Sequence, residues 1–102
     1  MSKATFLKDL DVIQHLSKSN DYKYNLLKAS EELQELALVL TQKALKEEKV
    51  DIQEIIDEIG DVKIRIAVLD NLFDQKKIDK RIKFKLKKFN KYLKEGKYKK
   101  HI

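Results

Sequence analysis

Apolar residues recur every three or four positions along most of the chain, which is the period of an α-helix rather than of a strand. Polar clusters such as SKSND at 17–21 interrupt this pattern, and Asn20 or Asp21 is expected to cap the helix that follows. Short links between consecutive helices favour an up-down four-helix bundle. The helices predicted from the spacing cover residues 3–17, 22–47, 51–74 and 77–95.

The third predicted helix has the clearest start signals. Asp51 is suited to cap it, and Glu54, three residues later, completes the pattern of a capping box. Val50 and Ile55 stand where a hydrophobic staple would pack. At the other end of the chain, Gly96 is expected to end the last helix as its C′ residue.

The second and third helices are apolar on more than one side. The main stripe of the second helix, expected to be buried, comprises Leu26, Ala29, Leu33, Leu36, Ala37, Leu40 and Ala44. The corresponding stripe of the third helix comprises Ile55, Ile59, Val62, Ile66, Leu69 and Phe73. Further apolar residues lie away from these stripes: Leu27, Leu38, Val39 and Leu45, then Ile64, Val68 and Leu72. Because such helices must be covered on more than one side, the sequence predicts a homodimer or homotetramer.

Composition fits a single all-α domain spanning residues 1–102. The chain has no Pro and two Gly, and 42% of its residues are apolar while 39% are charged. The lack of Cys excludes disulfides and zinc–thiolate sites. The start MSKATFLKDLD has no apolar signal run, and no stretch is apolar enough to span a membrane. We therefore expect a soluble cytoplasmic protein without a membrane partner.

Charge is distributed unevenly along the chain. Residues 75–102 contain 13 Lys and Arg against 2 acidic residues, so the other 10 basic and 15 acidic residues belong to residues 1–74. A lysine-rich last helix can bind nucleic acid through phosphates without sequence specificity. A solvated helix face is the simpler interpretation of most of these lysines, and no recognised nucleic-acid-binding motif is present. Nucleic acid is therefore not the expected partner.

Two groups of carboxylates interrupt the apolar pattern of the second and third helices. They are Glu31, Glu32 and Glu35 in KASEELQEL, and Glu58 and Asp61 in EIIDEIGDV. Residues three or four apart are neighbours on a helix, and antiparallel packing of the two helices would bring the two groups together. Facing carboxylates repel one another unless they are protonated or bridged by a cation. Oxygen ligands without His or Cys suit Mg²⁺, with Mn²⁺ as the alternative ion.

Two other interpretations of these acids remain. They can form a solvated helix face, in which Lys28 or Lys63 pairs with some of them. A ferritin-like di-iron site requires Glu-x-x-His on two helices, and the only histidines, His15 and His101, are remote in sequence from the carboxylates. The di-iron interpretation is therefore poor.

The pattern EExxE followed by ExxD resembles the signature of the MazG-type all-α nucleoside triphosphate pyrophosphohydrolases. The run FKLKKFNKYL at 84–93 is similar to the lysine/arginine motif of short, phage-type members. The likeness covers about residues 25–93. It implies a bundle that assembles as a homo-oligomer and uses Mg²⁺ to hydrolyse nucleoside triphosphates between the α and β phosphates, giving the monophosphate and pyrophosphate.

The resemblance also implies a role for individual residues. Glu31 would orient the attacking water or act as its base. The metal ligands would be Glu32, Glu35, Glu58 and Asp61, and the phosphate-binding residues would be Lys85 and Lys88.

The residue types agree with attack by water. The chain has no Cys, so a thiolate nucleophile is excluded. The rival hypothesis is a non-catalytic helical module that binds a nucleotide, a nucleic acid or a partner protein. Five carboxylates in two phased groups favour the hydrolase, because binding alone would not need all of them.

Overall fold

The computed structural model describes residues 3–46 and 50–96, with side chains described from residue 9 onward, and the described part is all-α. Its helices are α1 (Lys3–Ser19), α2 (Tyr22–Leu45), α3 (Ile52–Leu72) and α4 (Gln75–Lys94), with no strand in these ranges. The predicted bounds are confirmed to within two residues at each end. Most of the predicted connection at 46–49 lies outside the described residues.

The chain divides into two units, residues 1–72 and residues 73–102. The first unit contains α1, α2 and α3, and the second contains α4. Among the described residues, none of the helices combines the length and apolar character needed to cross a bilayer.

Two aspartates cap α2 and α3 as the sequence predicts. The Oδ1 atom of Asp21 accepts a hydrogen bond from the Tyr24 backbone N–H at 2.6 Å. The Oδ1 atom of Asp51 accepts one from the Gln53 backbone N–H at 3.1 Å. Each carboxylate therefore satisfies a donor that the first helical turn leaves without an intrahelical partner.

The start of α4 differs from the prediction. The apolar pattern begins at Ile78, which placed the predicted start near residue 77, but the Oδ1 atom of Asp74 accepts from the backbone N–H groups of Lys76 and Lys77. The cap therefore moves the start of the helix back by two residues. At the other end Gly96 has φ of +71°, the left-handed conformation expected of a C′ glycine.

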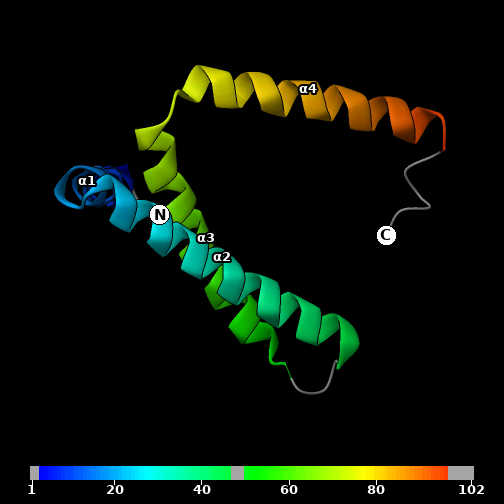
Figure 1. Ribbon diagram of the computed structural model, residues 1–102, viewed down its shortest axis with the longest axis horizontal. Helices are drawn as coiled ribbons and strands as arrows, with labels where there is room; N and C mark the ends of the chain where they lie inside the picture. The colour runs from blue at the N-terminus through cyan, green and yellow to red at the C-terminus, as the bar shows by residue number, and fades with distance from the viewer. Residues whose placement is uncertain (1–2, 47–49, 97–102) are drawn as a thin grey trace. The chain divides into compact units, whose positions relative to one another are not determined.

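The helices α2 and α3 lie side by side and run in opposite directions (Figure 1). Less exposed positions at steps of three and four mark the two sides that face each other along a seam. On α2 these seam positions are Asn25, Ala29, Glu32, Leu36, Val39 and Lys43, and Lys28 beside them is also half-buried. On α3 they are Ile55, Glu58, Val62, Arg65, Leu69 and Leu72, and Ala67, Val68 and Asp70 near the C-terminal end of the helix are covered as well.

The predicted buried stripes are only partly correct within one chain. Leu33 and Leu40 of the expected α2 stripe remain 43% and 46% exposed, and Ile59 and Ile66 of the α3 stripe remain 39% and 40% exposed. Both helices are apolar over much of their circumference, so periodicity selected the more apolar line. The seam instead follows a neighbouring line that includes polar residues.

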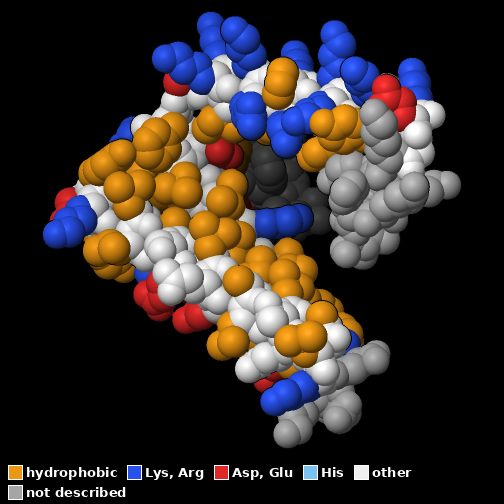
Figure 2. Space-filling model, turned by 45° about the vertical axis from the view of Figure 1, so that its right-hand side comes forward, with side chains coloured by type: hydrophobic (Ala, Val, Ile, Leu, Met, Phe, Trp, Pro, Cys, Tyr) orange, Lys and Arg blue, Asp and Glu red, His pale blue; other side chains and the backbone are white. Residues whose placement is uncertain are grey.

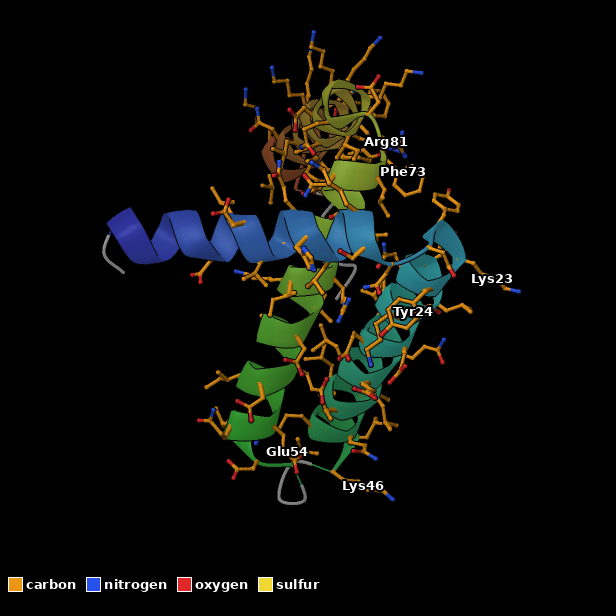
Figure 3. The ribbon with its side chains drawn as sticks, turned by 90° about the vertical axis from the view of Figure 1, so that its left-hand side faces the viewer. Lys23, Tyr24, Lys46, Glu54, Phe73 and Arg81 are labelled. Atoms are coloured by element: carbon orange, nitrogen blue, oxygen red, sulfur yellow. The ribbon has the colours of Figure 1, made fainter. Side chains whose placement is uncertain are left out.

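The helix α1 lies across the end of the hairpin where α2 begins and α3 ends (Figure 3). Hydrogen bonds hold α1 at this end of the hairpin. The Ser17 hydroxyl donates to the Ile13 carbonyl at 2.9 Å and accepts from Asn71 Nδ2 of α3 at 3.2 Å. Asn25 Nδ2 of α2 donates to the Leu16 carbonyl at 3.5 Å, a long contact.

In the second unit, α4 is strongly amphipathic and has no buried residue among those described. Leu86 and Leu93 are both more than half exposed. Lysines gather along the helix (blue in Figure 2). The Arg81 guanidinium lies 5.2 Å from the centre of the Phe84 ring, within cation–π range. Considered by itself, the helix therefore has an apolar stripe beside a basic face.

Val68 provides a test of the core of the first unit, because it is 1% exposed. Val68→Ala should lower the free energy of unfolding by about 2 kcal/mol through lost burial and a residual cavity. Val12→Ala makes the same chemical change at a 58% exposed site and should cost less than about 0.5 kcal/mol. Urea unfolding at one protein concentration measures both, and equal losses would contradict the packing described.

Candidate metal centre

Three carboxylates from two helices meet in the first unit. Glu32 of α2 and Glu58 and Asp61 of α3 each offer a carboxylate oxygen, and these three oxygens lie within 4.8 Å of one another. Glu32 and Glu58 are half-buried seam residues, whereas Asp61 is exposed at the edge of the seam. The antiparallel pairing of α2 and α3 therefore joins the two groups of acids that the sequence places apart.

The two half-buried carboxylates are incompletely satisfied. Glu32 Oε2 and Glu58 Oε2 are both buried, and neither has a hydrogen-bond partner among the described residues. An unsatisfied buried oxygen is costly, especially when it carries charge. A divalent cation would satisfy both oxygens at once. Around an octahedral Mg²⁺, opposite ligand oxygens lie about 4.2 Å apart and adjacent ones about 3 Å, so the three side chains would have to draw closer together to bind one ion.

The electrostatics of Glu35 and Glu58 reflect the same crowding. Repulsion from Glu32 is the main cause that raises the pKa of Glu35, followed by desolvation and repulsion from Glu58. Desolvation is the main cause that raises the pKa of Glu58, followed by repulsion from Asp61 and Glu32. Glu35 thus interacts with Glu32 and Glu58 of the cluster, although it is itself exposed. We call Glu32, Glu35, Glu58 and Asp61 the carboxylate centre.

Glu31 points away from the seam and pairs with a lysine. Lys28 Nζ lies 3.3 Å from Glu31 Oε1 and 3.6 Å from Glu32 Oε1, and its hydrogen bond to Glu31 is the main cause that raises the pKa of Lys28. The expected pairing of Lys28 is therefore confirmed. Lys63 forms no ion pair with any residue in the described ranges. One lysine at the outer edge does not neutralise four carboxylates.

A hollow of about 430 Å³ lies on the outer side of α2 beside the centre. Glu31 and Glu35 contribute to its wall, so it adjoins both the centre and the candidate base. The remaining lining residues are Leu27, Ser30, Gln34 and Leu38. All of these residues belong to α2, so the hollow is a shallow depression on the surface of that helix.

Two seam residues near the centre were not predicted from the sequence. Arg65 Nη1 and Asn25 Oδ1 are buried and have no hydrogen-bond partner among the described residues. Asn25 is 1% exposed, and Arg65 is half-buried. The available signal was their heptad-like spacing with Glu32 and Glu58. Polar residues at such positions are easily taken for surface residues.

The two lysines implied to bind phosphate, Lys85 and Lys88, lie on α4 in the second unit. Lys85 Nζ is 5.0 Å from the centre of the Phe89 ring, and Lys88 Nζ is 5.6 Å from the centre of the Tyr92 ring. Each charge therefore rests over an aromatic face one turn along the same helix. Their role at the carboxylate centre stays a prediction.

Comparison of the chain with family models, curated proteins and solved structures gave no match. The functional interpretation therefore depends on the residues and geometry of the centre.

The raised pKa values of Glu35 and Glu58 predict how the metal-free protein responds to pH. The folded state binds protons more readily than the unfolded state at these groups, so protonation stabilises the fold. Their stabilising contribution should grow as the pH falls through the raised values toward the ordinary value of 4.5. It should be lost as the pH rises through them. Thermal unfolding in EDTA measures the trend.

The variant Glu58→Gln tests how the charge of this carboxylate and a bound metal ion each change the stability of the protein. At pH 7 without metal this variant should melt above the parent protein, because it removes a repelled charge. Saturating Mg²⁺ should raise the parent Tm by about 5 °C, equivalent to about 1 kcal/mol in a domain of this size, but should do little to the variant. Glu54→Gln in the first turn of α3, outside the centre, is the control. An unchanged parent Tm with Mg²⁺ would argue against a metal centre.

Proposed function

We propose that the protein is a Mg²⁺-dependent nucleoside triphosphate pyrophosphohydrolase of the MazG-like type. The observation that supports this proposal most directly is the meeting of Glu32, Glu58 and Asp61 across two helices. Buried oxygens without partners on two of these residues add to it. A solvated acidic face would leave all its carboxylates in water, whereas Glu32 and Glu58 are half-buried, which supports a bound cation.

The proposed reaction joins a water oxygen to the α-phosphorus and breaks the bond from that phosphorus to the oxygen bridging to the β-phosphate. A divalent ion, when bound, favours deprotonation of water, polarises the phosphate and neutralises the leaving pyrophosphate. Glu31 borders the hollow beside the centre, and we propose it as the group that accepts the proton of the attacking water. Its ion pair with Lys28 is exposed and therefore weak, which allows the carboxylate to exchange partners.

The resemblance to the MazG-type family also assigns phosphate binding to lysines of the basic helix α4, and we retain this assignment in the proposal. The chain has no glycine-rich phosphate loop, with only two Gly in total. Lysine side chains must then bind the phosphates that the metal does not, and Lys85 and Lys88 are the proposed ligands. A concentration of positive charge along α4 would also attract an anionic substrate during diffusional approach.

Substitution at the centre tests the reaction. Glu35→Gln and Asp61→Asn should each reduce metal-dependent pyrophosphate release by at least about a hundredfold, the usual scale for losing one preorganised electrostatic group. Both substitutions preserve side-chain size, so the helical circular dichroism spectrum should not change. Glu54→Gln should retain activity. Wild-type rates in both centre variants would rule out the metal assignment.

The substrate panel distinguishes the two classes of function. Pyrophosphate release is measured with ribo-, deoxyribo- and modified nucleoside triphosphates, in Mg²⁺ and in EDTA. Release that depends on Mg²⁺ supports the hydrolase, and the ranking identifies the preferred base and sugar. A folded protein that releases nothing across the panel would favour the non-catalytic binding module.

Assembly as a homodimer or homotetramer is part of the same proposal. Leu33, Leu40, Ile59 and Ile66 form apolar surface on α2 and α3 that the helices of the first unit do not cover by themselves, and Figure 2 shows hydrophobic side chains over a wide area of this unit. Exposed apolar surface on this scale marks a site of association. Light scattering at low micromolar concentration should give at least twice the mass of 12.1 kDa, and a monomeric mass would contradict the assembly.

A further inference from the structure

We propose that the guanidinium of Arg65 binds phosphate oxygens of the ligand held at the carboxylate centre. The inference rests on the proposed function, because it requires a cation at the carboxylates and a phosphate beside it. It adds an anion-binding residue from α3 itself, separate from the lysines of α4.

The position of Arg65 follows from the register of the seam. It stands four residues after Asp61 and seven after Glu58, the spacing that keeps all three on one side of α3. Four residues correspond to about 6 Å along a helix axis. Long helical side chains also lean toward the N-terminal end of their helix, which for Arg65 is the direction of Asp61. The guanidinium is therefore within reach of a ligand bound at the centre.

Among the described residues, the side chain of Arg65 has no acidic partner for its positive charge. Its side chain is half-buried, and its Nη1 is buried with no hydrogen-bond partner among the described residues. It forms no ion pair with the carboxylates of Glu32 or Glu58, whose own Oε2 atoms are also buried without partners. An arginine stays charged under all ordinary conditions, and an unsatisfied buried donor is costly. Opposite charges thus share one seam without satisfying each other.

A ligand that carries both positive and negative charge would pair with both the carboxylates and the guanidinium. A divalent cation would bind to the carboxylates. Phosphate oxygens bound to that cation would then face the guanidinium of Arg65. The planar fork of arginine matches two phosphate oxygens, which a lysine ammonium does not. The ligand class is therefore a metal-bound di- or triphosphate, of which inorganic pyrophosphate is the simplest member.

A purely structural role for Arg65 predicts different behaviour. If Arg65 served only to offset the negative charge of the carboxylates, its removal would strengthen the binding of a cation and would leave pyrophosphate affinity unchanged. If it binds phosphate, its removal weakens pyrophosphate binding in the presence of metal. Measuring Mn²⁺ and pyrophosphate separately therefore distinguishes the two roles without any assay of turnover.

The test compares Arg65→Gln with Lys63→Gln in the full chain. Both substitutions remove one positive charge from α3, but Lys63 is exposed and lies about 160° around the helix from Arg65. Isothermal titration with pyrophosphate in saturating Mg²⁺ should show at least a tenfold loss of affinity for Arg65→Gln and at most a twofold loss for Lys63→Gln. Electron paramagnetic resonance should show that both variants still bind Mn²⁺.

Arg65→Lys keeps the charge but removes the fork, and it should bind pyrophosphate with intermediate affinity. If circular dichroism shows that Arg65→Gln does not fold, Arg65→Lys replaces it in the comparison with Lys63→Gln. Unchanged pyrophosphate affinity in the folded Arg65 variants would overturn this inference while leaving the metal centre and the proposed reaction intact. A parent protein that binds neither Mn²⁺ nor pyrophosphate would overturn both.

Discussion

Mutual repulsion among carboxylates in the seam between α2 and α3 is the constraint on which the rest of the structure depends. Glu32 and Glu58 stand at inward positions of this seam, where a two-helix interface normally places apolar side chains. Desolvation and repulsion raise the pKa of Glu58, and repulsion raises that of Glu35. Apolar neighbours such as Val62 must hold the helices together against this effect. A bound cation would attract the carboxylates that otherwise repel one another, so metal binding would stabilise the fold.

Polar residues in the seam also limit the core that one chain can form. The buried apolar residues of the described ranges are few: Ala29, Val50, Val62 and Val68. Small domains are marginally stable even with a complete core. The apolar residues displaced from the seam remain on the outside of α2 and α3, where a second copy would cover them. Charged residues at inward positions of the seam would thus account both for the carboxylate centre and for the expected self-association.

Periodicity and capping were sufficient to predict the four helices, since those signals are local. The meeting of Glu32, Glu58 and Asp61 was also predictable, because spacing fixes which residues share a helix side. The inward side of each helix was not, since α2 and α3 are apolar on several sides and the chosen line depends on the partner helix. Arg65 was missed for the same reason: a charged residue is assigned to the surface unless the seam register is known. The cap at Asp74 was missed because the apolar pattern starts later.

The order of charges along the seam bears on the choice between hydrolase and binding module. A free anionic nucleotide would be repelled by the carboxylate centre, so an anion can bind there only together with a cation. A module that merely bound nucleotides would be better served by lysines and arginines alone. Acidic residues for which we propose a metal, followed one turn later by Arg65 with an Nη1 atom that has no partner in the described part of the chain, instead match the charge sequence of a metal-bound polyphosphate. That match supports phosphate chemistry over binding, because a cation placed against the phosphate is what lowers the barrier to attack by water.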